Sequence, residues 1–195
     1  LLAMAAGCGS DSAGPAPTRL IVVAGGDGQS VPVTTGAVLT AKVTDVSGTP
    51  EEGVPVTWSV VTGGGTITSS SVTSVAGIAS DTFTLGQVAG QQVARASAEG
   101  VGGAPANFTV TATAGPATQI EKSAGDGQTG WAGSPLPQAY AVTVQDQYNN
   151  PVAGVTVTWA VASGGGALSS PSSVTAASGA ATVVQAIAEG RRAAY

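Results

Sequence analysis

The chain has little of what enzymes and nucleic-acid-binding proteins depend on. Its 195 residues include no histidine, one cysteine and six Lys and Arg, and only 9% are charged. Without histidine, the commonest general base is absent, and so is any Ser–His arrangement. Six scattered cations in a chain of net charge −5 cannot form the clustered basic face that nucleic acid requires. We therefore expect no enzyme, no catalytic residue and no nucleic-acid partner.

Metal and cofactor sites are also poorly supported. The absence of histidine and the single cysteine leave only oxygen ligands for a metal. Asp27 and Asp126 recur in two "GDGQ" segments and could lend a carboxylate to calcium, but a turn is the favoured interpretation because the EF-hand spacing is missing. Glu51 and Glu52 are neighbours in a turn, so their carboxylates diverge rather than face each other across a cleft. We expect no metal and no cofactor.

The chain begins with a short apolar segment that indicates where in the cell the protein is located. Residues 1–7, "LLAMAAG", are fewer than the roughly 20 that cross a bilayer, and they suit the remnant of a signal peptide that ends in small residues. Ala5-Ala6-Gly7-Cys8 resembles the bacterial lipobox, although Ala5 stands where Leu is usual. The alternative is a free cysteine at a ragged end, and a disulfide within the chain is excluded because Cys8 has no partner.

The lipobox resemblance implies that Cys8 is the lipid attachment residue and the new N-terminus. Its acyl chains would anchor the protein to the membrane of a bacterial cell envelope. Gly9 stands where some bacteria place Asp to retain a lipoprotein in the inner membrane, which favours the outer membrane or cell surface. Residues 8–17 then form the lipidated N-terminus and a flexible linker.

The rest of the chain is typical of strands joined by tight turns. Apolar residues make up 43% of the sequence, mostly Val and Ala alternating with Thr and Ser, and there are 29 glycines. Val54, Val56 and Trp58 share one face of a segment whose other face is polar. This period of two predicts a half-buried β-strand.

The same pattern occurs twice. Trp58 and Trp159 lie 101 residues apart, as do Asp45 and Asp146. We therefore expect tandem domains at residues 18–114 and 115–195, each about 100 residues or fewer, which suits a β-sandwich. The inward faces of their strands predict the structural core, which we expect to include Trp58, Trp159, Val56, Val157 and Phe83.

The second copy carries the most recognisable stretch. "VTVQDQYNNPVAGVTVTWAVASGGGALSS", followed by "ASGAATV", resembles the bacterial immunoglobulin-like domain of group 1, the invasin/intimin-type repeat. The resemblance extends from Ala13 to about Val184. It implies an all-β fold of two tandem immunoglobulin-like β-sandwich domains, and it is silent on the ligand. One departure is Asp81, which falls on an expected inward face.

The second copy is truncated. Only 16 residues follow Gly179, and Gln185 stands where Phe83 fills the core of the first copy. We expect this domain to be incomplete after about residue 184, to lack its last strands and to be loose beyond Val184.

Trp131 has no counterpart in the first copy and lies in a loop without alternation, "GQTGWAGSPLP". As an exposed aromatic residue it would be a candidate contact for a sugar or a protein. The alternative is a ring that covers the end of the sandwich or the domain junction.

Two functions from different classes follow. The favoured one is a non-catalytic cell-surface lipoprotein whose repeats form a stalk or spacer, or an adhesion module, with neighbouring repeats and a protein or glycan on another cell as partners. The alternative is a carbohydrate-binding or enzyme-accessory module that recognises a glycan through loops such as that of Trp131. A gene fragment without a function of its own is a third interpretation.

Overall fold

The computed structural model describes residues 18–102 and 104–189, and in these residues the protein is all-β, as the alternating sequence predicts. These described residues form fifteen strands in five sheets. No helix in the described residues is long and apolar enough to span a membrane. The sheets fall into two groups, which we call the first unit (β1–β8) and the second unit (β9–β15). Among the described residues no sheet mixes strands of the two units.

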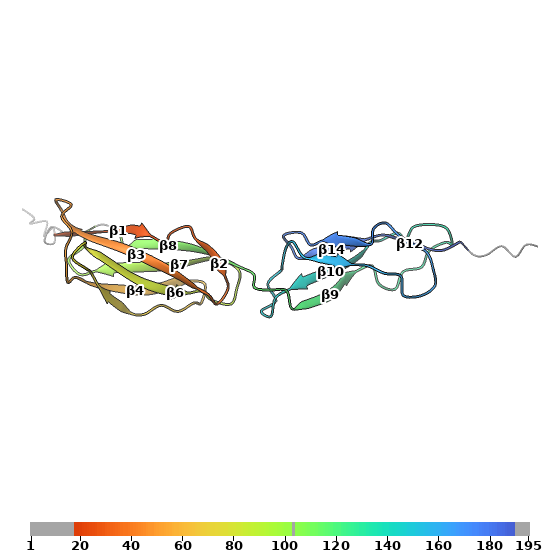
Figure 1. Ribbon diagram of the computed structural model, residues 1–195, viewed down its shortest axis with the longest axis horizontal. Coiled ribbons are helices and arrows are strands. Elements are labelled where there is room, and N and C mark those ends of the chain that lie inside the picture. Colours follow the sequence, from red (N-terminus) through yellow and green to blue (C-terminus); the bar gives the residue numbers. More distant parts are fainter. Residues whose placement is uncertain (1–17, 103, 190–195) are drawn as a thin grey trace, which may run out of the picture.

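The first unit packs two sheets face to face around one core (Figure 1). One sheet has the order β1-β3-β6 and the other the order β2-β8-β7-β4-β5. Its strands are β1 (Arg19–Gly25), β2 (Ser30–Pro32), β3 (Gly36–Asp45), β4 (Pro55–Thr62), β5 (Ser70–Val72), β6 (Ile78–Thr84), β7 (Gly90–Ala98) and β8 (Ala106–Thr113).

The core of the first unit lies between these sheets and is built from their alternating inward residues. Trp58 is 3% exposed, and Val56 and Phe83 are fully buried. The indole of Trp58 packs against the ring of Phe108 with centroids 5.6 Å apart, so β4 and β8 meet through their aromatic side chains.

The second unit repeats one of these sheets but not the other. The sheet β14-β10-β9 corresponds to β6-β3-β1, whereas the opposite side has only the pairs β11-β13 and β12-β15. Its strands are β9 (Gln119–Ala124), β10 (Tyr140–Gln145), β11 (Thr156–Thr158), β12 (Ala167–Leu168), β13 (Ser172–Val174), β14 (Ala180–Val183) and β15 (Gln185–Ala186).

Trp159 therefore differs from the expectation that it lies in the core. Val157 is buried, but the Trp159 side chain is only partly buried against the small cluster around it. The physical reason is that the described residues of the second unit contain no counterpart of β7, which pairs with β4, or of β8, whose Phe108 packs against Trp58.

Residues 185–187 take part in backbone pairing, although the chain beyond Val184 was expected to be loose. Gln185 and Ala186 pair with β12. The N–H of Leu136 donates to the Gln185 carbonyl at 2.8 Å, and the N–H of Ile187 donates to the Ser134 carbonyl at 3.0 Å. Backbone hydrogen bonds hold this segment even though Gln185 replaces the core Phe83.

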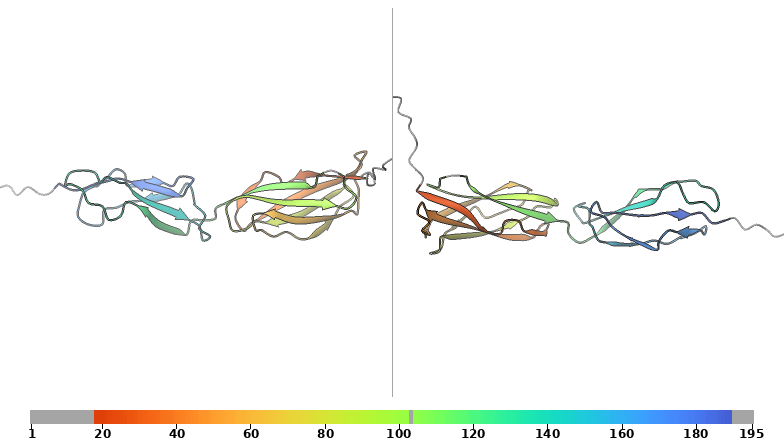
Figure 2. Two further views of the ribbon diagram at one scale, coloured as in Figure 1. Left: turned by 180° about the vertical axis from the view of Figure 1, so that it is seen from behind. Right: turned by 90° about the horizontal axis from the view of Figure 1, so that it is seen from above.

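The two units lie end to end along the long axis of the molecule (Figures 1 and 2). A short connection leads from the end of β8 at Thr113 to the start of β9 at Gln119. Because this arrangement makes the molecule long and narrow, the contact between the units decides whether it is stiff.

Candidate functional site: the junction between the units

The turn after β10 forms the centre of the junction. The carboxylate of Asp146 is 1% exposed and accepts four hydrogen bonds. Its Oδ1 accepts the N–H groups of Tyr148 and Asn150 at 2.8 and 2.9 Å. Its Oδ2 accepts the N–H of Gly115, in the connection between units, at 2.8 Å, and the side-chain amide of Asn150 at 2.9 Å. Asp146 thus fixes both the turn and the connection.

These contacts set the charge state of Asp146. Burial by itself would raise the pKa of this carboxyl, but the hydrogen bonds from the Asn150 side chain and from the N–H groups of Gly115, Asn150 and Tyr148 outweigh it and hold the pKa below its ordinary value. The group is therefore a carboxylate at neutral pH, in which form it can accept all four bonds.

Asn150 crosses from the second unit to the first. It is 6% exposed, and its amide nitrogen donates to the Gln87 carbonyl at 2.8 Å while its amide oxygen accepts the Ala89 N–H at 2.8 Å. A buried amide whose donor and acceptor are both paired with the backbone of the other unit fixes orientation as well as contact. Tyr148 adds an apolar contact, because its ring packs against the core of the first unit.

The first unit presents a rigid receptor for Asn150. Gln87 and Ala89 lie in the connection between β6 and β7, and the buried side chain of Gln92 braces it from inside. The Gln92 side chain accepts the Gly86 N–H at 2.8 Å and donates to the Val88 carbonyl at 2.9 Å. Each side of the junction is thus held by its own buried polar side chain.

The same turn in the first unit shows which residues belong to the junction alone. Asp45 accepts the N–H groups of Ser47 and Thr49, both at 2.8 Å, so the turn itself is common to both copies. Ser47 and Thr49 stand 101 positions before Tyr148 and Asn150. The docking side chains are therefore specific to the second copy. The alternating strand pattern does not indicate this site, and the difference between "DVSGTP" and "DQYNNP" within a repeat was the available signal.

The two "GDGQ" segments form turns. In each, the glutamine amide nitrogen donates to the carbonyl of the first glycine: Gln29 to Gly26 at 2.8 Å and Gln128 to Gly125 at 2.6 Å. Asp27 accepts the N–H of Thr109 at 2.7 Å, and Asp126 pairs with Lys122. Within residues 18–102 and 104–189 no three acidic or other ligating side chains gather as a metal site would require.

The remaining candidate residues lie apart from the junction or outside the described chain. Trp131 is 86% exposed, so its ring covers neither the sandwich end nor the junction. Cys8 lies outside the described residues. Glu51 is half-buried and pairs with Arg19, whereas the neighbouring Glu52 is exposed.

The fold and the comparisons now define the class of module. Residues 137–186 match the family described as the bacterial Ig-like domain, group 1, so the family resemblance is confirmed over this part of the chain. The all-β fold is of the immunoglobulin-like kind. A search of curated proteins found no match.

The structure is similar to that of FdeC, an Escherichia coli adhesin, with 20% sequence identity and a TM-score of 0.54. The match covers 89% of this chain and 56% of the FdeC chain, so the present chain spans little more than half the length of that chain. The D0-D1 domain of intimin (22% identity, TM-score 0.39, 86% of this chain and 83% of that one) and invasin (17% identity, TM-score 0.41, 87% and 34%) also match.

Proposed function

We propose that the chain is a non-catalytic spacer of the bacterial cell surface, whose two units act as one stiff rod in a stalk or adhesion protein. The buried bridge from Asn150 to the Gln87 and Ala89 backbone carries this proposal. Domains joined by a flexible linker need no buried polar contact with each other. A rod that holds a binding surface away from the membrane needs such a contact, because the contact fixes the orientation of one domain against the next. The adhesin FdeC, with the same fold, is consistent with this role.

Replacing Asn150, whose side-chain amide bridges the units, tests whether they act as one stiff rod. Asn150→Ala removes both hydrogen bonds to the first unit and leaves the Gln87 carbonyl and Ala89 N–H unpaired, which weakens the junction by about 1–3 kcal/mol. We expect the distribution of distances between spin labels on the two units to broaden, while the first unit unfolds as before. Thr49→Ala, the equivalent change in the first unit, is the matched control and should leave the distribution unchanged. Equal distributions in the Asn150→Ala variant and the unaltered chain would contradict the proposal.

We further propose that Cys8 anchors the rod in the envelope. This rests on the lipobox resemblance of residues 5–8. Labelling of cells with a radioactive fatty acid should mark the expressed protein and not its Cys8→Ser variant. Equal labelling of the two would exclude Cys8 as the attachment residue without affecting the spacer role.

Trp131 supports a second candidate function, glycan recognition. Its indole is 86% exposed in a loop that backbone hydrogen bonds connect to residue 187, and it lines a hollow with Pro135 and Pro137. An exposed aromatic face on a braced loop suits stacking against a sugar ring. On a glycan array, Trp131→Ala should lose binding that Trp131→Phe partly keeps. Absence of glycan binding by the unaltered chain would remove this candidate.

A further inference from the structure

The outer edge of β6 in the first unit is only partly paired. β6 is an edge strand, because β3 is its one neighbour in the sheet β1-β3-β6. On the other side of β6, Thr84 exchanges both backbone hydrogen bonds with Thr66, at 2.8 Å each. At the opposite end of the strand the Ile78 carbonyl accepts the Ser74 N–H at 2.9 Å. Residues 79–83 lie between these two contacts.

Two of these residues direct their backbone groups to the open side. Successive residues of an antiparallel strand alternate in the side to which they hydrogen-bond, so Ser80 and Thr82 point away from β3, as Thr84 does. Both residues are exposed. Over the part of the chain that the structure describes, no other strand pairs with them on this side. Unpaired backbone groups at the edge of a sheet are a template for another strand.

Asp81 lies between these two residues and points inward, opposite the buried Leu39. Its Oδ1 accepts the Thr82 N–H at 2.6 Å, so the side chain occupies one of the donors at the open edge. Its Oδ2 is buried, and no described group donates a hydrogen bond to it. Charged residues that point inward from an edge strand are one means by which β-proteins prevent the addition of a further strand.

In the second unit the corresponding edge is closed. Ser169 holds the position of Thr68, 101 residues earlier in the chain. The Ser169 N–H donates to the Val184 carbonyl at 2.8 Å, and the Ser169 Oγ accepts the Val184 N–H at 3.1 Å. Val184 is the counterpart of Thr82. The second unit therefore satisfies, with its own chain, the backbone groups that the first unit leaves open.

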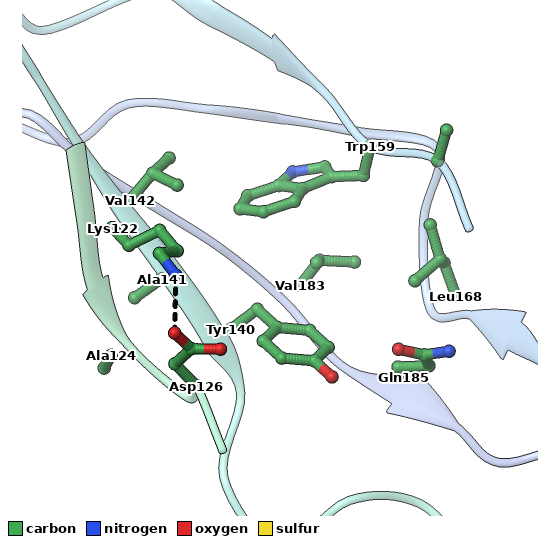
Figure 3. A pocket seen from close by; sticks show the side chains of 11 residues that line it. Lys122, Ala124, Asp126, Tyr140, Ala141, Val142, Trp159, Leu168, Val183 and Gln185 are labelled. Carbon is green, nitrogen blue, oxygen red and sulfur yellow. Dashed lines mark hydrogen bonds and ion pairs between the residues drawn. The ribbon is translucent and has the colours of Figure 1, made fainter. Parts of the chain in front are cut away.

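The residue that corresponds to Asp81 is apolar in the second unit. Val183 lies opposite Tyr140 on β10. Asp81 has the same place opposite Leu39 on β3. Figure 3 shows the side chain of Val183 between those of Trp159 and Tyr140. The carboxylate is thus present in the unit whose edge is open, and a valine takes its place where the edge is closed.

The open edge is complementary to the same edge of a second copy. When two β6 strands meet antiparallel about a twofold axis at Asp81, Ser80 of each copy lies opposite Thr82 of the other, and each such pair exchanges two backbone hydrogen bonds. The contacts at Thr66 and Ser74 end this pairing on either side. Residue 81 then faces itself in a non-hydrogen-bonded pair, where the Cα atoms are about 4.5 Å apart. Two carboxylates directly opposite each other destabilise such a pairing.

We propose that Asp81 guards this edge: it prevents residues 79–83 of the first unit from pairing with the same residues of a second copy. The edge is a self-association surface that the carboxylate keeps closed. The buried, unpartnered Oδ2 is explained by this role, since a valine there would improve the core and open the edge. The role goes beyond that of a spacer and does not depend on it.

Asp81→Val tests the guard. Sedimentation velocity over a range of concentrations should show a monomer for the unaltered chain and a reversible dimer for the variant, with a dissociation constant lower by about tenfold or more. Amide exchange should show Ser80 and Thr82 newly protected in the dimer. Asp126→Val removes the same charge from an exposed turn of the second unit, so it is the matched control and should stay monomeric.

Three further variants keep the test decisive. Thr82→Pro, added to Asp81→Val, removes an edge N–H at a position where an edge strand tolerates proline, and should restore the monomer. Asp81→Thr also removes the carboxylate, and should dimerise even if the valine variant fails to fold. In a Cys8→Ser background, Asp81→Cys should form a disulfide-linked dimer, because the symmetric register places residue 81 opposite itself within disulfide distance.

A folded Asp81→Val variant that stays monomeric at every concentration would overturn the guard. A dimer in which the Ser80 and Thr82 amides stay unprotected, or which Thr82→Pro leaves intact, would overturn the edge as the surface of association. Protection of the same amides in a dimer of the unaltered chain would show that Asp81 does not close the edge.

Discussion

At the scale of single residues, Asp81 is the clearest conflict between the sequence and its environment. Its Oδ2 is buried without a hydrogen-bond partner, while Oδ1 accepts the N–H of the adjacent Thr82 at 2.6 Å. Asp81 lies opposite Leu39 on β6, a strand that pairs with β3 at one edge of its sheet. The equivalent position of the second unit, opposite Tyr140, holds Val183.

Asp81→Val should therefore stabilise the first unit. Removing an unpaired buried oxygen and adding apolar contact is expected to raise the free energy of unfolding by about 1–2 kcal/mol. Urea denaturation followed by Trp58 fluorescence measures it. Asp81→Asn, which keeps a polar group at the site, should gain much less. A less stable Val variant would show that the carboxylate has a partner that this account omits.

The two equivalent tryptophans should also differ in what they contribute. Trp58 packs against Phe108 in a closed core, and its replacement by Ala should cost about 3–5 kcal/mol. Trp159 borders an open hollow, so Trp159→Ala should cost clearly less. Calorimetry of each variant gives the comparison, and equal losses would mean that the second core is closed in solution.

At the scale of elements, the alternating strands were predictable and the contacts between units were not. Alternation around Trp58 and the 101-residue repeat predict the strands and the two copies, because burial on one face imposes a period of two. The junction depends on Tyr148 and Asn150, which lie in a turn rich in polar residues. Nothing in such a turn indicates that a side chain there becomes buried against residues some 60 positions earlier.

The partial exposure of Trp159 was unpredictable for a related reason. Its local sequence has the pattern of a core strand, and it is partly exposed because the described residues of the second unit contain no counterpart of β7 or β8. How far this residue is exposed depends on which strands pair across the sheet, and the repeat alone does not specify that pairing.

The Asp146 turn should make the junction sensitive to acid. Hydrogen bonds hold the pKa of Asp146 in the folded protein below its ordinary value of 3.8. A lowered pKa contributes stability that is fully present above the ordinary value and is lost as the pH falls through the folded value. We expect the junction to hold from neutral pH down to about pH 4 and to loosen only below 3.8.

A ¹³C titration of the Asp146 carboxyl, followed with the amide signals of Gly115 and Ala89, measures this. The three should change together below pH 3.8. Asp126, whose pKa is lowered by its exposed hydrogen bond with Lys122, is the internal control, since its titration should leave the Ala89 signal unchanged. Changes at Ala89 that begin well above pH 3.8 would contradict the assignment.

At the scale of the whole molecule, the two units lie end to end and one polar bridge joins their backbones (Figure 1). Length comes from the sandwiches, each of which buries its own apolar side chains. In the proposed rod, stiffness comes from Asn150 and Tyr148, which the first copy of the turn replaces by Thr49 and Ser47. A chain with the same sandwiches and the first copy's turn would keep its length and lose its stiffness.

The most direct test of this account is a set of residual dipolar couplings for the backbone amides of both units, measured on the intact chain in one weakly aligned sample. A rod held by the Asn150 bridge predicts that residues of the first and second units fit a single alignment tensor of equal magnitude. Two tensors of clearly different magnitude would show that the units reorient independently, and the spacer would then be a flexible string rather than a rod.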